Sequence, residues 1–575
     1  MKGRVPMIRL SAEGPGQNVQ KKKRRVDMAL KPTIGAYLIS RLWQMGIRHV
    51  FGVAGDYVLK FFDLIEESDI RLINTCNELN AGYAADGYAR IAGAGAVCVT
   101  YGVGGFSVYN AVAGAFAERV PLVVVSGGPK TSLRGRLHPY LLHHTIGEMG
   151  LQREIFERIT QSAFVLTNPT HAPWHIDEAL AACVRYSRPV YIEIPADMVM
   201  EGCSPPGAWA PDNSLHMDPE VLDEAIGETL DRISAASRPV ILAGVEVDRL
   251  GARDALLRLI DRTGFPVATT GLGKGVVPER TKGYVGTYIG ALANETARRT
   301  VEDADLLLCL GAWMTDLDLG GYTAHLDEGR MIIANSERVR VRHHVYEHVP
   351  IKDFIEGLAG HVQEGRAGGG RGERQEAPAG APSYTASPGA RLTTDRFWDR
   401  MSHFLRDGHI VVSDTGSCTF ESVKLSLPQK ADYIGQSFYT SMGYAIPAAL
   451  GAKFAAPSTR PVVFVGDGAF QMTGQELSTV IRHGQNPVVF LLNNDGYQVE
   501  RAMYDNAYND INMWDYTQVV EAFGGGKGVR VSTEGDLEAF LANAADNPDT
   551  LMFAEVRLGR SDFSATLRLI GERLR

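Results

Sequence analysis

The sequence has few of the features that mark secreted, membrane-spanning or nucleic-acid-binding proteins. Its six cysteines show no CxxC spacing, which argues against a zinc site and against a disulfide framework. No apolar run reaches about 18 residues, so no membrane-spanning helix is expected. The net charge of −9 at pH 7 gives no indication of nucleic-acid binding. We therefore expect a cytoplasmic protein in a reducing compartment, with neither nucleic acid nor a membrane as a partner.

Apolar runs of strand length alternate with helical stretches in three parts of the 575-residue chain. The predicted domains cover 28–200, 219–363 and 392–575, in keeping with a length that suits roughly three or four domains. Such alternation is typical of α/β domains with doubly wound parallel sheets. The expected strands are HVFGV, AVCVTYG, PLVVVSG and PVYIEI in the first domain, PVILAG, FPVATT, DLLLCLG and MIIAN in the second, and HIVVSD, PVVFV, PVVFLL and LMFAEV in the third.

Three segments outside these domains differ from them in composition. The stretch 1–27 contains the basic run KKKRR and is predicted to be a disordered extension, with a nuclear-localisation signal as the alternative. A proline-rich linker is expected at 201–218. The stretch 364–391 is dense in Gly, Pro, Ala and Arg, and it has too little apolar surface to order itself. We predict that it is a flexible linker.

A GDG triplet at 466–468 is the most informative motif. It follows the run PVVFV, and a second run, PVVFLL, ends at Asn493 and Asn494. The spacing between Asp467 and Asn494 suits a strand, a crossover helix and a second strand, so both residues should lie at neighbouring carboxyl ends of a parallel sheet. Oxygen ligands beside close-approach glycines suit Mg²⁺ bound to a diphosphate. Ordinary turn glycines are the alternative.

Three α/β units with this motif in the third resemble the thiamine diphosphate enzymes of the pyruvate, indolepyruvate and phenylpyruvate decarboxylase family. The segment CNELNAGYAADGYAR is similar to the family's pyrimidine-binding segment, and FGVAGDY, LLHHTIG and NNDGYQVER match other family motifs. The resemblance extends from Met28 to the C-terminus. It implies an enzyme that decarboxylates a small-molecule 2-oxo acid to an aldehyde and carbon dioxide, with thiamine diphosphate and Mg²⁺ as cofactors.

The resemblance also implies a set of catalytic residues. Glu78 would hydrogen-bond to the aminopyrimidine ring and favour the tautomer that deprotonates the thiazolium carbon, a task helped by burial of the carboxyl group. Asp56 and Glu500 would deliver protons to the reacting carbon. His144 would orient the substrate beside His143. A satisfied loop feature is the alternative for the histidine pair.

The cofactor-holding residues follow from the same resemblance. The metal ligands would be the side chains of Asp467 and Asn494 and the backbone carbonyl of Gly496. In this family the two ends of the cofactor bind different subunits, so a homodimer is the implied minimum and a homotetramer is expected. The remaining contacts are expected from Thr415, from the carbonyl of Thr440, from Met442 as the bulky residue that bends the cofactor, and, around the diphosphate, from Gly466, Gly468, Ala469 and Phe470.

Two departures from the pyruvate-specific pattern bear on the substrate. Thr419 stands where typical pyruvate decarboxylases carry tryptophan, and Val499 stands where they often carry isoleucine. Both changes remove volume from a pocket that is also expected to include Met503. We therefore expect phenylpyruvate or indolepyruvate as the substrate, followed by branched-chain 2-oxo acids. If a neighbouring side chain refills the space, pyruvate becomes the alternative.

Three other functions compete with this interpretation. A carboligase on the same scaffold would add the decarboxylated intermediate to a second carbonyl compound. A non-catalytic regulatory or storage protein would have no need for Glu78, the histidine pair and Glu500. A nicotinamide-dependent dehydrogenase is the weakest alternative, because FGVAGD lacks the GxGxxG pattern and its acidic ribose partner.

Overall fold

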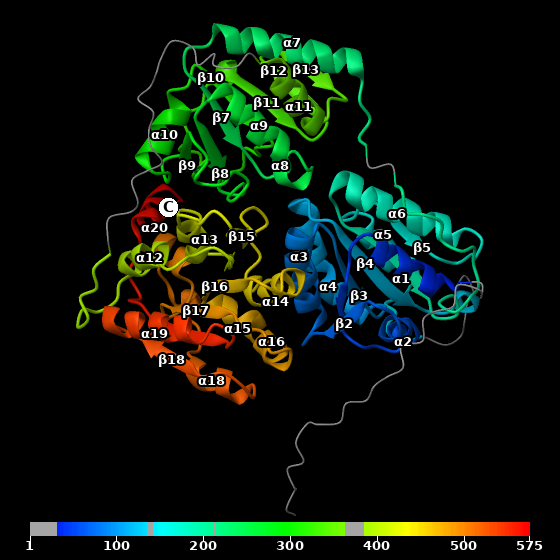
Figure 1. The fold of residues 1–575 in the computed structure, drawn as a ribbon. Coiled ribbons are helices and arrows are strands. Elements are labelled where there is room, and N and C mark those ends of the chain that lie inside the picture. The colour runs from blue at the N-terminus through cyan, green and yellow to red at the C-terminus, as the bar shows by residue number, and fades with distance from the viewer. Residues whose placement is uncertain (1–31, 135–141, 212–213, 363–383, 575) are drawn as a thin grey trace, which may run out of the picture.

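The computed structural model describes residues 32–134, 142–211, 214–362 and 384–574. These residues form three α/β domains, coloured blue to cyan, green, and yellow to red in Figure 1. The predicted extension at 1–27 and most of the predicted linker at 364–391 lie outside the described residues.

The N-terminal domain contains a six-stranded sheet in which every pairing is parallel. Strands in the middle of this sheet are continuous apolar runs because helices cover both faces. The strand order is β2-β1-β3-β4-β6-β5. The strands are β1 (His49–Gly52), β2 (Arg71–Asn74), β3 (Gly95–Val99), β4 (Leu122–Gly128), β5 (Ala163–Val165) and β6 (Val190–Pro195), and the helices are α1 (Ile34–Gln44), α2 (Leu59–Glu67), α3 (Glu78–Ala92), α4 (Val103–Ala117), α5 (Leu151–Phe156) and α6 (Ala172–Tyr186).

The central domain contains a seven-stranded sheet in the order β13-β12-β11-β10-β7-β8-β9. Its pairings are parallel except at β11–β12 and β12–β13, so an antiparallel hairpin extends the expected parallel sheet. The strands are β7 (Pro239–Ala243), β8 (Val267–Thr270), β9 (Tyr284–Tyr288), β10 (Leu306–Leu310), β11 (Met331–Asn335), β12 (Arg338–Val341) and β13 (His344–Glu347), and the helices are α7 (Pro219–Ala235), α8 (Glu246–Arg249), α9 (Arg253–Thr263), α10 (Glu295–Glu302) and α11 (Ile351–His361).

The C-terminal domain contains a second all-parallel six-stranded sheet, in the order β15-β14-β16-β17-β19-β18. The strands are β14 (His409–Ser413), β15 (Asp432–Gly435), β16 (Arg460–Gly466), β17 (Val488–Asn493), β18 (Gly528–Val531) and β19 (Met552–Arg557), and the helices are α12 (Thr394–Ser402), α13 (Ser417–Ser422), α14 (Ala445–Ala455), α15 (Asp467–Thr473), α16 (Leu477–Arg482), α17 (Gln498–Met503), α18 (Tyr516–Ala522), α19 (Glu534–Asp546) and α20 (Ala565–Leu574).

The N-terminal and C-terminal sheets share one topology. When strands are numbered within each domain, both sheets read 2-1-3-4-6-5. The strand order therefore reverses between β1 and β3 in one sheet and between β14 and β16 in the other. Open α/β sheets bind ligands beyond the carboxyl ends of strands at such a reversal. Each domain thus presents one topologically equivalent edge for a site.

Helices α3 and α14 join these two domains, and Figure 1 shows them side by side between the sheets. Their backbones touch at glycines: a Cβ on Gly87 would overlap the backbone of Ala448, and one on Gly451 would overlap the backbone of Ala84. Larger residues at either glycine would force the helices apart. Among the helices of the described residues, none has the length and apolar character needed to cross a membrane.

Candidate active site

The residues predicted to bind a metal lie together at the carboxyl ends of β16 and β17. Asp467 is buried, and its Oδ2 accepts hydrogen bonds from the N–H groups of Asn494 at 3.2 Å and Gly496 at 3.0 Å. Its Oδ1 accepts one from the N–H of Gly468 at 2.8 Å. Because β16 and β17 pair in parallel, the loops that follow these two strands lie next to each other. One carboxylate therefore organises both motifs.

The electrostatics of this edge fit a bound cation. Burial raises the pKa of Asp467 to about 6, against the opposing effect of its three backbone hydrogen bonds. Asn494 Oδ1 is buried and has no hydrogen-bond partner among the described residues. A buried acceptor left unpaired costs on the order of 1–3 kcal/mol. A cation with oxygen ligands, such as Mg²⁺, would satisfy this amide oxygen and compensate the desolvated carboxylate.

The loop after β17 has a backbone that requires glycine. Gly496 has a φ of 121°, and a Cβ at this position would overlap the carbonyl oxygen of Asn509. Arg501 holds the same loop: its buried guanidinium donates to the carbonyl oxygens of Asn494 at 3.3 Å and Asp495 at 2.9 Å. Arg501 was not predicted as a site residue, although it lies within the segment NNDGYQVER.

The expected diphosphate contacts lie at the same edge. Gly466, Gly468, Ala469 and Phe470 form the end of β16 and the first turn of α15. A Cβ on Gly468 would lie 2.5 Å from the ring of Tyr497, so its close packing depends on glycine. Thr415 follows β14, the neighbouring strand, and its buried hydroxyl has no partner among the described residues. That hydroxyl is available for an oxygen-rich ligand.

Thr440 and Met442 lie on the segment between β15 and α14. Asp414, at the end of β14, is fully buried and accepts hydrogen bonds from the N–H groups of Gly443 at 2.9 Å and Ala445 at 2.7 Å. Burial raises its pKa to about 6. Asp414 thus ties this segment to the sheet. It was missed in our sequence analysis, although it follows an apolar strand in the same way as Asp467.

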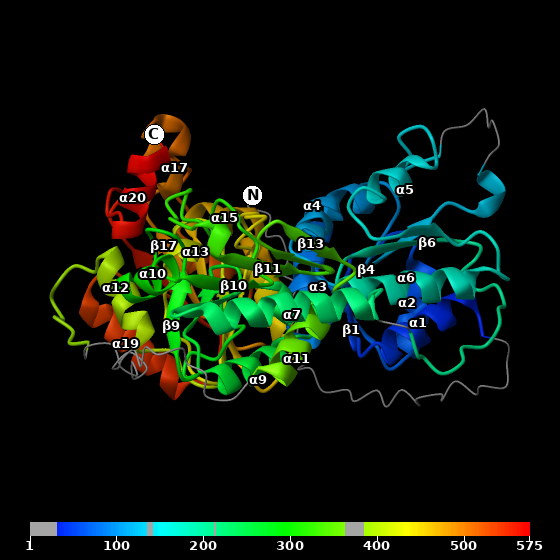
Figure 2. The ribbon, with the colours of Figure 1, turned by 90° about the horizontal axis from the view of Figure 1, so that it is seen from above.

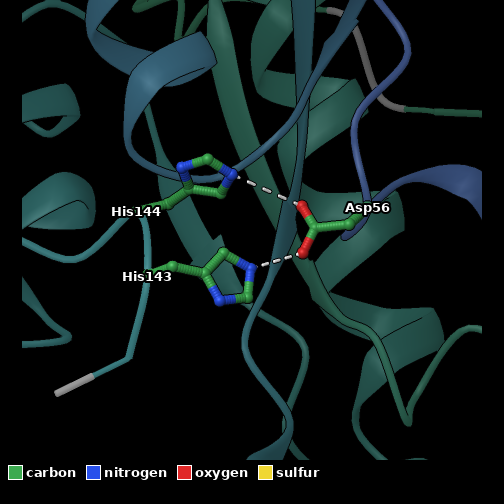
Figure 3. A group of neighbouring side chains, drawn as sticks. All are labelled: Asp56, His143 and His144. Atoms are coloured by element: carbon green, nitrogen blue, oxygen red, sulfur yellow. Dashed lines mark hydrogen bonds and ion pairs between the residues drawn. The ribbon is translucent and has the colours of Figure 1, made fainter.

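A second group lies at the equivalent edge of the N-terminal sheet, where Asp56 follows β1. In Figure 3 the rings of His143 and His144 each point toward a different oxygen of the Asp56 carboxylate. His143 Nε2 lies 2.6 Å from Oδ2, and His144 Nε2 lies 3.6 Å from Oδ1. Thr100, which follows β3, donates its hydroxyl to Oδ1 at 3.5 Å. The strand reversal therefore brings together residues that are distant in the sequence.

The charge of this group favours an ionised carboxylate. Partial burial acts to raise the pKa of Asp56, but the hydrogen bond and charge of His143 and the charge of His144 outweigh it and lower the pKa below its usual value. The ring of His143 stacks on Tyr57, with 5.4 Å between centroids and 9° between planes. Tyr57 is the third residue at the site, after Arg501 and Asp414, that was not predicted from the sequence.

Glu78 lies beside this group. It is the first residue of α3, after the N-cap residue Asn77, whose side chain accepts from the N–H of Asn80. A Cβ on Gly104 would lie 3.4 Å from Glu78 Oε1, and one on Gly102 would overlap the carbonyl oxygen of His144. The loop after β3 is therefore flanked by Glu78 and His144. The Glu78 carboxylate is partly exposed and has no hydrogen-bond partner among the described residues.

The expected pocket residues lie on facing helices of the C-terminal domain. A Cβ on Gly416, at the start of α13, would lie 3.9 Å from Val499 of α17. Thr419 is buried on α13 and donates its hydroxyl to the carbonyl oxygen of Asp414 at 2.7 Å. Glu500, on α17, is exposed, and Met503 is partly buried on the same helix. Figure 2 shows that α20 stands next to α17.

The candidate residues of the two edges are not directly bonded to each other within one chain. Across the described ranges, no hydrogen bond or ion pair joins Glu78 or Asp56 to Glu500 or to Asp467. Each edge therefore holds one part of the residue set that the motifs indicate.

Comparison with known proteins identifies the family. Models of the thiamine pyrophosphate enzymes match 32–155 as the N-terminal TPP binding domain, 226–358 as the central domain and 414–555 as the C-terminal TPP binding domain.

Whole-chain relatives agree with these matches. The chain is 36% identical over 557 residues to pyruvate decarboxylase 4 of Arabidopsis thaliana, covering 94% of this chain and 91% of that protein. It is 36% identical over 563 residues to pyruvate decarboxylase of Aspergillus fumigatus, covering 94% and 96%. It is 35% identical over 543 residues to alpha-keto-acid decarboxylase of Mycobacterium leprae, covering 93% and 94%. The chain therefore belongs to the thiamine diphosphate enzymes and, within them, to the 2-oxo acid decarboxylases.

Proposed function

We propose that the protein is a Mg²⁺- and thiamine diphosphate-dependent enzyme that decarboxylates a bulky 2-oxo acid to an aldehyde, with phenylpyruvate and indolepyruvate as the preferred class. The observation that carries this proposal is the pair of equivalent sheet edges. One edge offers Asp467 and Asn494 as oxygen ligands, and the other offers Asp56, His143 and His144 as acid and base groups. Bound thiamine diphosphate would supply the electron sink for loss of carbon dioxide.

The C-terminal edge would hold the cofactor. Asp467, Asn494 and the carbonyl of Gly496 would bind Mg²⁺, since a buried carboxylate and an unpaired amide oxygen suit a hard cation. The first turn of α15 and the hydroxyl of Thr415 would contact the diphosphate. Thr440 would accept from the aminopyrimidine through its carbonyl oxygen, and Met442 would pack against the bent cofactor.

The N-terminal edge would handle protons and the substrate. A proton can pass between His143 Nε2 and Asp56 Oδ2 across 2.6 Å. The Asp56 carboxylate also holds His144, whose ring would orient the substrate carboxylate. Glu500 would be the second proton donor, from α17 of the C-terminal domain. Asp56 and His143 are both exposed, so a ligand can reach their side chains.

A homodimer would complete the site. The Glu78 carboxylate is partly exposed and has no hydrogen-bond partner among the described residues, so it is open to a group from a second copy. Large apolar side chains are exposed near both edges: Val103, the first residue of α4, is 56% exposed, and Met472, on α15 after Asp467, is 43% exposed. A second copy would cover these side chains and bring Glu78 of one subunit to the cofactor of the other. A tetramer of two such dimers is the fuller assembly that we propose.

The proposed substrate size rests on Thr419, Val499 and Met503. Gly416, at the start of α13, approaches Val499 of α17, so Thr419 and Val499 would line one region of the pocket. A threonine in place of an indole leaves room for an aromatic ring, whereas a single methylene changes selectivity by only about 1–3 kcal/mol. Pyruvate is the second candidate, because the plant and fungal relatives are named pyruvate decarboxylases.

A substrate panel tests the proposal. The purified protein, with Mg²⁺ and thiamine diphosphate, is given pyruvate, phenylpyruvate, indolepyruvate or 2-oxoisovalerate, and both carbon dioxide and aldehyde are measured. We expect both products, with kcat/KM at least about tenfold higher for the aromatic acids. Thr419→Trp should reverse that order in favour of pyruvate, whereas Thr419→Val, which keeps the volume, should not.

Three outcomes would contradict the proposal. Carbon dioxide with acyloin and no aldehyde would identify a carboligase. A wild-type preference for pyruvate would remove the bulky-substrate assignment. Unchanged decarboxylation by Glu78→Gln would remove the proposed activation of the cofactor.

A further inference from the structure

The segment 436–445, which carries Thr440 and Met442, has a strained backbone. Thr440 has a φ of 55°, in the left-handed region, where a β-branched residue is a conformational outlier. Such a conformation persists only where the surroundings over-determine the backbone. Most of the segment lies between β15 and α14, outside any regular element. Its conformation must therefore be imposed by contacts with other parts of the protein.

Glu118 of the N-terminal domain supplies the contacts at one end of the segment. This residue follows α4 and is fully buried. Its Oε1 accepts hydrogen bonds from the N–H groups of Phe438 and Tyr439, both at 2.9 Å. Its Oε2 accepts from the guanidinium of Arg90 at 2.8 Å. One carboxylate thus fixes two consecutive peptide groups that directly precede Thr440.

Asp86 supplies the contact at the other end. The hydroxyl of Tyr444 donates to Asp86 Oδ1 at 2.6 Å, and Arg90 Nε donates to the same oxygen at 2.6 Å. Arg90 therefore bridges the two carboxylates that hold the two ends of the segment. It also donates to the carbonyl oxygen of Gly435, the residue before the segment, at 3.3 Å.

The middle of the segment meets the same domain. Asn110 of α4 donates its Nδ2 to Ser441 Oγ at 2.9 Å and accepts the hydroxyl of Tyr439 at 3.0 Å. A Cβ on Gly114, one turn further along α4, would lie 2.8 Å from Gln436 Nε2 and 2.9 Å from the ring of Tyr439. The segment is therefore in contact with the N-terminal domain along its length.

We propose that Glu118, together with Arg90 and Asp86, is a positioning residue for thiamine diphosphate, because it fixes the segment from which Thr440 and Met442 contact the cofactor. The inference rests on the proposed roles of Thr440 and Met442. Buried ion pairs are a poor source of net stability, whereas breaking one leaves an uncompensated buried charge. Loss of the Glu118 charge should therefore release the segment and weaken cofactor binding.

Glu118→Gln tests this inference with little change of shape. Either orientation of the new amide directs N–H donors at Arg90 or at the N–H groups of Phe438 and Tyr439. Hydrogen exchange of a peptide spanning 436–445, measured by mass spectrometry in cofactor-free protein, should accelerate at least about tenfold. Thiamine diphosphate affinity at saturating Mg²⁺, measured by calorimetry, should fall by a similar factor. Tyr444→Phe, which removes one hydroxyl, should cause smaller changes in the same direction.

Glu246→Gln is the matched control. Glu246 is also a buried carboxylate between domains: it pairs with Arg119 at 2.9 Å and accepts from the Ser336 hydroxyl at 2.7 Å. Among the described residues, its side chain forms hydrogen bonds and ion pairs with Arg119, Asn335 and Ser336 and with none in 436–445. The control should lower the unfolding temperature while leaving exchange of 436–445 and cofactor affinity as in the wild type.

Two results would overturn the inference. One is wild-type exchange and wild-type cofactor affinity in both Glu118→Gln and Tyr444→Phe. The other is an equal effect of Glu246→Gln on both measurements, which would indicate general loosening of the fold. Failure of the proposed function would look different from failure of this inference. If the wild-type protein did not bind thiamine diphosphate, the proposed function would fail, but hydrogen exchange of 436–445 could still be compared between the wild type and the variants.

Discussion

Replacement of Gly496 by alanine should weaken Mg²⁺ binding by moving one proposed ligand, the backbone carbonyl of residue 496. Gly496 has a φ of 121°, a conformation that L side chains rarely adopt, and holding a non-glycine residue there costs on the order of 1–3 kcal/mol. The new Cβ would also overlap the Asn509 carbonyl oxygen and lie 3.2 Å from the Arg501 guanidinium. Because the overlapped atom of Asn509 belongs to the backbone, it cannot rotate away, and the loop with residue 496 has to move by on the order of 1 Å to restore ordinary contact distances.

A movement of that size is large for a magnesium ligand. Mg²⁺ requires near-octahedral oxygen ligands at about 2.0–2.1 Å, so the Gly496 carbonyl would leave the coordination shell. A loss of about 3 kcal/mol corresponds to roughly a hundredfold weaker binding, since each 1.4 kcal/mol is about tenfold. We therefore expect Gly496→Ala to lower Mg²⁺ affinity, at fixed thiamine diphosphate, by about a hundredfold in calorimetric titrations.

Gly466→Ala is the control for this prediction. Gly466 lies at the same edge but has a φ of −75°, and a Cβ there has no neighbour within 4 Å. The cofactor-free control should unfold at the wild-type temperature. Mg²⁺ affinity of Gly496→Ala within about threefold of the wild type would refute the assignment of its carbonyl as a ligand.

Three further predictions concern protons and the helix that carries Glu500. Because the pKa of Asp467 is raised from 3.8 to about 6, Mg²⁺ must displace a proton from this carboxyl below that pH. The affinity of the protein for Mg²⁺, measured by calorimetry and corrected for Mg²⁺ binding to free cofactor, should be constant above about pH 7 and fall about tenfold per pH unit below pH 6. A flat profile would contradict the raised pKa. Asp56→Asn should lower kcat by about a hundredfold with unchanged cofactor affinity, as measured by aldehyde release and calorimetry, because it removes the charge that holds both imidazoles. Gly571→Ala, on α20, should lower kcat/KM by about tenfold at unchanged Mg²⁺ affinity, because the new Cβ would overlap the Ala502 carbonyl oxygen and displace α17. Unaltered kinetics would mean that α20 does not position α17.

In the N-terminal and C-terminal domains, the strands that could be predicted from the sequence are those inside the sheets. The predicted runs correspond to β1, β3, β4 and β6 and to β14, β16, β17 and β19, whereas the short edge strands β2, β5, β15 and β18, three or four residues long, were missed. In the central domain the runs correspond to β7, β8, β10 and β11, whereas the edge strand β9 and the hairpin strands β12 and β13 were missed. An edge strand has solvent on one side and needs no continuous apolar run, so its sequence carries a weaker signal.

The same distinction applies to the candidate site. Asp467 and Asn494 could be placed together from spacing, because one crossover joins two neighbouring parallel strands. The contact of Asp56 with His143 joins loops 87 residues apart and was expected only through the family motifs. Asp414 and Glu118 belong to no motif, and their importance follows from the backbone groups that they bind. The role of such residues can be recognised only from the folded structure, in which N–H donors from distant parts of the sequence surround their carboxylates.

Helix α3 connects the two halves of the proposed site. Glu78, its first residue, would act on the cofactor bound by a partner subunit, whereas Asp86 and Arg90 of the same helix hold the segment with Thr440 and Met442 in their own subunit. A rigid 15-residue helix cannot shift one end without the other. A substitution that moves α3 against α14, such as Gly87→Ala, would therefore disturb cofactor activation in one site and cofactor positioning in the other.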